Sequence, residues 1–235
     1  MPATPASQRP HDEAARLRSL RAHDVLPTLV EPVFDEFVAL TAQVFSLPIS
    51  LIGVVEETEV FYAVNHGMAG NDRQPRVEAL CATAIEQARA VVYHDLALET
   101  SATVPVEALH AAENNELRFY AGALLHLPDQ RLLGTLCIID RRPRTFSAGE
   151  QCVLDLLAAL ISQAIAMRLA CLAQGGPGQW EETRAQLQDE LRELTALVRY
   201  LFTRHGVQIP VPADVLTQVE RRLLDLQRLL TNQEC

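Results

Sequence analysis

The chain has 235 residues, of which 49% are hydrophobic and 21% are charged, and its formal net charge is −10. These values are typical of a globular protein with enough apolar side chains to form a core. The excess of acidic residues argues against nonspecific nucleic-acid binding and against an anionic membrane surface, because both require an excess of positive charge. We therefore expect neither a nucleic-acid nor a membrane partner.

The amino-terminal segment is polar and rich in proline, and no apolar signal sequence stands before the first cysteine. This composition predicts a disordered leader over residues 1–12 and a cytoplasmic location. The five cysteines are an odd number and none of them stands in a Cys-x-x-Cys pair. The pattern favours reduced thiols and gives no zinc framework, and the scattered histidines lack metal-ligand spacing.

The next part of the chain alternates helical and strand patterns. Apolar residues at helical spacing predict a short helix over residues 12–23 and a longer one over residues 31–46. Residues 48–67 are rich in Ile, Val, Phe and Tyr and predict two strands joined by a charged turn. We then expect the following elements: a helix over residues 77–87, a short strand over residues 90–96, and a loop over residues 97–116 with one helical turn.

A β-hairpin is predicted over residues 117–140, "LRFYAGALLHLPDQRLLGTLCIID". A two-residue turn at Asp129–Gln130 would place residue 122 opposite residue 137. One face would then be apolar: Phe119, Ala121, Ala123, Leu125, Leu132, Gly134, Leu136 and Ile138. The other face would be mixed: Tyr120, Gly122, Leu124, His126, Leu133, Thr135, Cys137 and Ile139.

The mixed face supplies the candidate ligand-binding residues. It combines apolar surface with a phenol, a hydroxyl, a thiol and an imidazole, as small-molecule pockets do. The candidates are Tyr120, Thr135, Cys137 and His126, together with Cys81, which begins a helical turn and would face the same pocket. A partly solvated sheet face has the same composition, so both interpretations stay open. Within this face we expect Cys137 to be a small buried hydrophobic residue rather than a reactive thiol.

A long helix is predicted from Ser147 to about Ala173. Ser147 and Glu150 have the spacing of a capping box at its start. Its most apolar part, residues 152–173, contains Asp155, Gln163 and Arg168, which a bilayer span would expose to hydrocarbon. We therefore expect a buried helix.

Residues 178–235 have a different pattern, in which leucines and valines recur every three or four positions. The first set is Leu187, Leu191, Leu194, Val198 and Leu201, and a second set follows the Gly206 and proline break. Each set is a short heptad seam, so we predict a carboxy-terminal helical hairpin. A narrow apolar stripe needs a partner, which could be the second helix, the domain or another subunit. We predict the last of these, a homodimer joined through the first set.

Several of these segments resemble a known family. The stretches "ALCATAI", "VVYHDL" and "RFYAGALLHLPDQRLLGTLCIIDRRPRTFS" are similar in order and spacing to a GAF domain of bacterial sensory proteins, of the subtype that often precedes diguanylate cyclase or histidine kinase modules. The resemblance covers residues 13–174. It implies an α+β fold with an antiparallel sheet of about six strands and helices on one side, and a ligand pocket covered by loops and short helices on the other.

The resemblance does not identify a ligand. The second strand has "EVFYAV" where this subtype usually carries a tryptophan, and the loop over residues 96–116 lacks the expected Asp-Pro-Arg-Phe-like stretch. No cofactor is firmly implied. The arginines after Asp140 (Arg141, Arg142 and Arg144) are expected in a solvated turn, with an anion site as the alternative.

No catalytic triad, paired carboxylates or nucleotide-binding motif stands out, so we do not expect an enzyme. The predicted function is a stand-alone sensory or regulatory module that binds a small ligand or senses redox state. It would signal to a partner protein through dimeric terminal helices. Two alternatives remain: a thiol enzyme of the free methionine sulfoxide reductase type, and a structural dimerisation scaffold without a ligand.

Overall fold

The computed structural model describes residues 9–70, 72–174 and 177–232. The helices are α1 (Arg9–His23), α2 (Leu26–Leu29), α3 (Pro32–Phe45), α4 (Leu80–Gln87), α5 (Val106–Asn114), α6 (Ala148–Ala173), α7 (Pro177–His205) and α8 (Ala213–Asn232), with short 3-10 turns η1 (Arg76–Glu78) and η2 (Leu96–Leu98). The strands are β1 (Ile49–Val55), β2 (Glu59–His66), β3 (Arg73–Pro75), β4 (Val91–Tyr93), β5 (Phe119–His126) and β6 (Leu132–Asp140).

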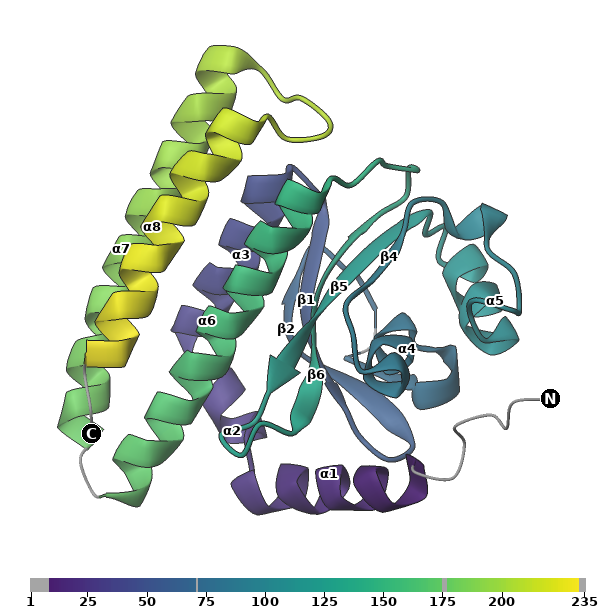
Figure 1. Cartoon of the computed structure of the whole chain (residues 1–235), viewed down its shortest axis with the longest axis horizontal. Coiled ribbons are helices and arrows are strands. Elements are labelled where there is room, and N and C mark those ends of the chain that lie inside the picture. The colour runs from purple at the N-terminus through teal and green to yellow at the C-terminus, as the bar shows by residue number, and fades with distance from the viewer. Residues whose placement is uncertain (1–8, 71, 175–176, 233–235) are drawn as a thin grey trace.

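The strands form one antiparallel sheet in the order β3-β2-β1-β6-β5-β4. Helices α3 and α6 cover one face of this sheet, and α4 and α5 lie on the other (Figure 1). The tail helices α7 and α8 form a further layer outside α3 and α6. The α+β class, the six strands and the helical cover expected from the sequence are confirmed, while the three-residue edge strand β3 was not predicted.

Helix α3 shows how the pattern specifies this arrangement. Pro32 starts the helix, where its missing N–H costs no hydrogen bond, and Ser46 ends it with a left-handed φ of 50°. Its expected apolar face is buried against the sheet and the neighbouring helices: Val33, Phe34, Phe37, Val38, Thr41, Val44 and Phe45. Burial of this face, rather than helix propensity, holds the helix in place.

The β5–β6 hairpin has the predicted register over most of its length, with Gly122 opposite Cys137. Near the turn a β-bulge shifts the pairing, so that Leu125 pairs with Gly134 but His126 pairs with Leu132. The extra residue, Leu133, therefore packs in the core on the α6 side, and Leu132 packs on the opposite side. The predicted faces are wrong for these two leucines and correct for the other apolar residues of the hairpin that pack in a core.

Helix α6 begins with the predicted capping box: the Ser147 hydroxyl accepts from the Glu150 N–H, and the Glu150 carboxylate accepts from the Ser147 N–H. Among the described residues, α6 is the one helix long and apolar enough to cross a membrane by length and composition. Here it packs between the sheet and the tail, and Leu154, Leu157 and Ile161 are fully buried.

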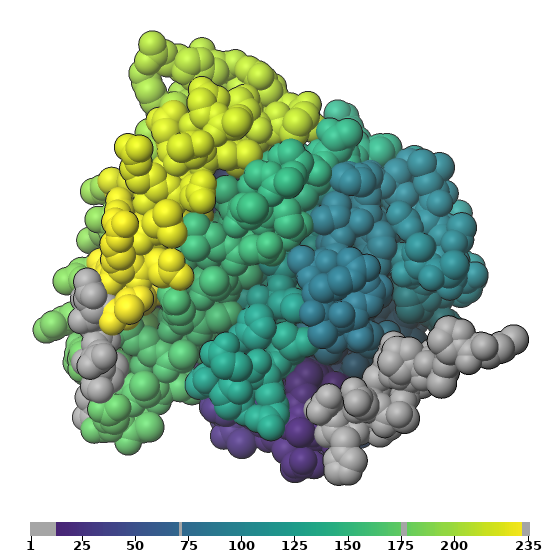
Figure 2. Space-filling model, viewed as in Figure 1, coloured from purple at the N-terminus to yellow at the C-terminus, as the bar shows by residue number. Residues whose placement is uncertain are grey.

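The tail forms the expected pair of helices, and its apolar stripe is covered within the chain. Leu187, Leu191, Leu194, Val198 and Leu201 are all buried within the chain, where α7 packs on α3 and α8. Figure 2 shows the tail lying directly against the rest of the molecule. The stripe therefore does not need a second subunit for its burial, because the chain's own α3 and α8 supply the missing apolar surface. The homodimer itself stays a prediction.

Two expectations concern the ends of the chain. Residues 1–8 of the expected leader lie outside the described residues, and α1 begins at Arg9.

Cys171, near the end of α6, is disulfide-bonded, which differs from the expectation that all thiols are reduced. The thiols of Cys81, Cys137 and Cys152 are free.

Candidate functional site

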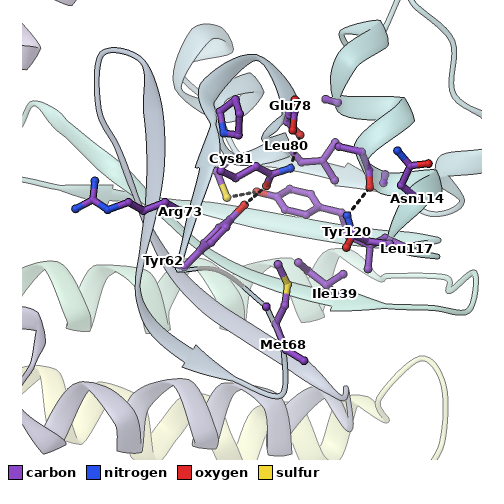
Figure 3. A pocket seen from close by; sticks show the side chains of 18 residues that line it. Tyr62, Met68, Arg73, Glu78, Leu80, Cys81, Asn114, Leu117, Tyr120 and Ile139 are labelled. Carbon is purple, nitrogen blue, oxygen red and sulfur yellow. Dashed lines mark hydrogen bonds between the residues drawn. The ribbon is translucent and has the colours of Figure 1, made fainter.

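A cavity of about 320 Å³ lies on the α4 and α5 side of the sheet. Its walls come from β2, the segment between β2 and α4, the first turn of α4, helix α5, and the strands β5 and β6 (Figure 3). The side chains that define its shape and polarity are Tyr62, Gln74, Leu80, Ala112, Tyr120 and Ile139. This is the side on which the family resemblance places a ligand pocket, away from α3, α6 and the tail.

The strand register determines where the aromatic side chain of Tyr120 lies in the cavity. Tyr120 and Ile139 face each other across β5 and β6 and therefore project from the same face. Gly122 lies beneath the phenol, because a Cβ atom built there would be 2.6 Å from the Tyr120 hydroxyl oxygen. A glycine at this position is what allows the Tyr120 ring to lie along the strand.

Tyr62 reaches the same cavity because β2 contains a bulge. The pairing with β1 shifts between Ile52 and Gly53, so Ile52 pairs with Val64 and Gly53 pairs with Tyr62. Val60 and Tyr62 thereby face the cavity side, whereas Val64 packs in the core on the α3 side.

The polar groups of the cavity are already partly engaged. The Tyr62 hydroxyl donates to Gln74 Oε1 at 2.5 Å, and Gln74 Nε2 donates to the Glu78 carbonyl at 3.0 Å. At the rim, Arg73 pairs with Glu59, so its charge is compensated. Burial raises the pKa values of Tyr62 and Tyr120, which keeps both phenols neutral and able to donate.

Two thiols lie close together beside the cavity: Cys81 lines it, and Cys137 is buried behind Cys81. Cys81 Sγ is 4.0 Å from Cys137 Sγ, and the Tyr120 hydroxyl donates to Cys81 Sγ at 3.4 Å. Figure 3 shows the side chains of Tyr62, Cys81 and Tyr120 directed toward one another. The hydrogen bond with Cys137 is the largest effect on Cys81 and lowers the pKa of that thiol to about 7 despite burial. The same hydrogen bond and burial raise the pKa of Cys137.

The structure separates the five predicted binding residues into three groups. Tyr120 and Cys81 line the cavity. Thr135 and Cys137 are completely buried in β6 and are not among the lining residues. His126 is half-buried near the hairpin turn and does not line the cavity either. Burial of Cys137 agrees with the expectation of a small core residue, although its neighbour is a second thiol rather than apolar side chains alone.

Sequence reasoning missed the cavity residues contributed by β3, η1 and α5. Gln74, Glu78, the α5 residues Ala112 and Asn114, and Asn115 just after α5 line the cavity but lie in segments without a clear strand pattern. The available signal was the apolar spacing of residues 106–112, which in the structure is part of a nine-residue helix. No group of three or more metal-ligating side chains occurs in the described ranges of the chain.

A chain of polar contacts, exposed at His94 and buried at Arg144 and Glu150, leads from the edge of the cavity-bearing half of the domain to the tail. The backbone of Arg144 exchanges hydrogen bonds with His94, which follows β4: its N–H donates to the His94 carbonyl, and its carbonyl contacts His94 Nδ1, both at 2.9 Å. The Arg144 guanidinium contacts Glu150 Oε1 at 2.8 Å and the Phe45 carbonyl at 2.6 Å. Glu150 Oε1 also accepts from the backbone N–H of Val211, between α7 and α8, at 3.1 Å.

This arrangement corrects the interpretation of the arginines after β6. Arg141 and Arg142 are exposed, as a solvated turn requires. Arg144 instead is 4% exposed, and its partner Glu150 is fully buried. The charge of Arg144 is used inside the protein, so it is not free to bind an external anion.

Comparison with known proteins gives one curated relative and several solved structures. A cyclic di-GMP phosphodiesterase of Pseudomonas aeruginosa is 27% identical over 210 residues, which cover 88% of this chain. The chain spans only about a third (33%) of that relative's length.

The solved structures include a Thermosynechococcus elongatus PixJ GAF domain in its blue-light absorbing form, with a TM-score of 0.50, 18% identity, and coverage of 68% of this chain and 93% of that one. A Neisseria meningitidis free methionine-R-sulfoxide reductase has a TM-score of 0.47, 20% identity, and coverage of 64% and 89%. At 18% identity, the likeness to the PixJ domain shows the fold alone.

The family model described as "GAF domain" matches residues 30–165. The matched range runs from the segment before α3 through the sheet and cavity into α6, and so contains the whole candidate site. It covers more than half of the 235 residues. The chain belongs to the GAF domain family.

Proposed function

We propose that this chain is a sensory or regulatory module that binds a small, mostly uncharged molecule in the cavity beside Tyr120. Binding of this molecule would change the arrangement of the terminal helices α7 and α8, which would contact a signalling partner. The observation that carries the proposal is the cavity itself, which combines two neutral phenols and a Gln74 amide with apolar walls. Such a mixture suits a ligand that has both ring or alkyl surface and a few hydrogen-bonding groups.

The curated relative supports a place in signalling. Its name describes a cyclic di-GMP phosphodiesterase, and this chain aligns with about a third of it. We place the chain in the regulatory part of such a system, where it would control the turnover of a cyclic dinucleotide messenger rather than carry it out.

The route from the cavity to the partner would use the polar contacts that join His94, Arg144 and Glu150. His94 lies beyond β4, and Glu150 holds the Val211 N–H in the connection between the tail helices. A ligand that moves the β4 edge would therefore change the support of the α7–α8 pair. The partner would meet the outer surface of that pair, where Tyr200 and Leu224 are exposed.

Two alternatives lead to different measurements. A reductase of the free methionine sulfoxide type would consume the free sulfoxide in the presence of a thiol reductant. A structural scaffold would be unaffected when its cavity is filled. We expect no sulfoxide turnover above a blank without protein.

The test is native mass spectrometry of freshly purified protein, followed by thermal denaturation with any retained molecule and with a library of small signalling metabolites. Ala112→Phe places a ring in the cavity, because Ala112 is buried and lines it. Ala185→Phe, at an exposed alanine of α7, is the matched control. We expect a ligand to raise the melting temperature of the native protein and of the control, but not of Ala112→Phe.

Equal stabilisation of all three proteins would place the ligand elsewhere and contradict the proposal. Sedimentation velocity on the same samples gives the subunit number with and without ligand. If a ligand binds in the cavity but changes neither the subunit number nor the protease resistance of the tail helices, the chain is a binding module without signal transfer.

A further inference from the structure

Cys81 and Cys137 form a pair of free thiols that come from different elements. Cys81 lies in the first turn of α4, and Cys137 lies in the middle of β6. Their sulfur atoms are 4.0 Å apart, and neither takes part in a disulfide. Two thiols this close, on elements that pack together, can be joined by a modest movement.

The two thiols differ in access. Cys81 is only 2% exposed, but it belongs to the lining of the cavity, so a small solute can approach it from inside the cavity. Cys137 is fully buried, pairs with Leu51 on one side and Gly122 on the other, and does not line the cavity. A reagent therefore reaches Cys81 first and finds Cys137 behind it.

The two thiols also differ in charge. The Cys81 thiol accepts a hydrogen bond from the Tyr120 hydroxyl at 3.4 Å, and its pKa is lowered to about 7, mainly through the hydrogen bond with Cys137. The pKa of Cys137 is raised, first by that hydrogen bond and then by burial. Near neutral pH, Cys81 is thus the sulfur that becomes a thiolate, and the thiolate is the nucleophilic form.

From the contact between the sulfurs and the one-sided access, we propose that Cys81 is an oxidation site for small hydroperoxides that enter the cavity, and that Cys137 closes a reversible disulfide with it. This inference goes beyond the proposed function, because the reaction needs no bound signalling ligand. It assigns distinct roles to the two cysteines: Cys81 is attacked first, and Cys137 resolves the product.

The chemistry balances in two steps. The Cys81 thiolate attacks a peroxide oxygen, so that an S–O bond forms, the O–O bond breaks, and the leaving oxygen takes a proton to become water or an alcohol. The sulfur is oxidised by two electrons and the peroxide is reduced. The Cys137 sulfur then attacks the Cys81 sulfenic acid; the S–S bond forms, the S–O bond breaks, and the hydroxide leaves as water with the Cys137 proton.

Closing the disulfide would change the shape of the cavity. An S–S bond is about 2.05 Å long, so the sulfurs must approach each other by about 2 Å from their present separation. Leu80 precedes Cys81 on α4 and also lines the cavity, so a shift of this turn moves the cavity wall. Oxidation of the two thiols and binding of a ligand in the cavity would therefore influence each other.

The test uses the full chain with Cys152→Ser, which removes the exposed free thiol. The protein is treated with hydrogen peroxide or tert-butyl hydroperoxide at pH 7, free thiols are alkylated, and the unreduced protein is digested with trypsin. Cleavage after arginine releases Cys81 in residues 77–89 and Cys137 in residues 132–141. We expect these two peptides to appear as one cross-linked species that dithiothreitol separates.

Single variants test the order of events. In Cys137→Ala the reaction should stop at a Cys81 sulfenic acid, which dimedone traps. In Cys81→Ala, Cys137 should remain alkylatable only after unfolding and should not be oxidised. Tyr120→Phe removes the hydroxyl donor and should slow oxidation at pH 7 by roughly two- to fivefold, with the rate recovering at higher pH.

Three results would overturn the proposal. These are oxidation of Cys137 in Cys81→Ala, over-oxidation of Cys81 to the sulfinic acid without a cross-link while Cys137 is present, and survival of both thiols under conditions that oxidise Cys152 in the native chain. Thermal denaturation of each variant shows that it is folded before treatment. Because the readout is the disulfide itself, failure to find a cavity ligand would leave this result unaffected, and the reverse also holds.

Discussion

Replacement of Glu150 by glutamine should strongly destabilise the protein, although the side chain keeps its size. The fully buried Glu150 carboxylate accepts hydrogen bonds from the Arg144 guanidinium at 2.8 Å, from the Val211 N–H at 3.1 Å and from the Ser147 N–H at 2.7 Å. In Glu150→Gln one acceptor oxygen becomes an NH₂ group that faces donors. The Arg144 charge, 4% exposed, then has no counter-charge in contact.

The size of the effect follows from this geometry. Breaking a buried ion pair by removing one partner costs about 3–5 kcal/mol, because an uncompensated charge stays in the interior. A domain of this kind has a total stability of about 5–15 kcal/mol. For a chain of this length, each kcal/mol lowers the melting temperature by about 2–4 °C, so we expect a decrease of about 6–20 °C.

The measurement is thermal and urea denaturation followed by circular dichroism, with limited proteolysis of the connection around Val211. Asp155→Asn, which removes a carboxylate from a solvent-exposed position on the same helix, is the control and should change stability by less than about 0.5 kcal/mol. A Glu150→Gln protein as stable as this control would refute the argument that the pair is energetically coupled to the fold.

A double replacement separates the uncompensated charge from the lost contact to the tail. Arg144→Met with Glu150→Leu removes both charges, and apolar replacements of buried pairs are often close to neutral. We expect the double variant to recover much of the stability lost by Glu150→Gln. It should still leave the tail connection more open to protease, because the Val211 N–H has lost its acceptor.

Three further outcomes follow from packing and charge. Gly134→Ala should prevent normal folding, since its Cβ would lie 1.9 Å from a backbone oxygen of β1, whereas Gly178→Ala, with open space around it, should be neutral or slightly stabilising in the same denaturation assay. Leu191→Asp should release the tail from its own domain, at a cost of about 3 kcal/mol or more, and make α7 susceptible to protease before the sheet unfolds. The pKa of Glu13 is lowered to about 2, first by its hydrogen bond to an α1 arginine, so its contribution to stability is present above pH 4.5 and is lost as the pH falls toward 2. Glu13→Gln should therefore make the urea midpoint depend less on pH between pH 6 and pH 3. A pH dependence of the midpoint equal to that of the native protein would contradict this assignment.

The sheet and its covering helices could be predicted from the sequence because local rules determine them. The alternating pattern of the two hairpin strands sets which side chains share a face over most of their length. The prediction failed at Leu132 and Leu133, where one extra residue forms a bulge. No local pattern in two adjacent leucines indicates which of them is the extra one.

The candidate site was less predictable because many of its lining residues lie in segments where the sequence predicted neither a strand nor a full helix. The hairpin register identified Tyr120 and located Cys137 on the same face. The contact between Cys137 and Cys81 depends on how α4 packs across β6, which brings together residues 56 positions apart in the sequence. The Gln74 amide lies on the short edge strand β3 and the α5 residues on a short helix, and the position of both depends on the assembled sheet.

The apolar stripe on α7 shows the limit of such reasoning most clearly. Heptad spacing establishes that Leu187, Leu191 and their neighbours must be buried, because leaving them in water costs about 25 cal/mol for each Å² of apolar surface. It does not establish what covers them, since α3, α8 or a second copy of the chain would gain the same free energy. Within one chain the entropic cost of association is already met by the covalent connection, so a surface of its own domain competes favourably with a second subunit. The outer side of α3 and α6 is apolar enough to accept the tail, and the chain uses it. Any contact with a partner protein must then involve the residues that this packing leaves outside, such as Tyr200, or require the tail to leave the domain.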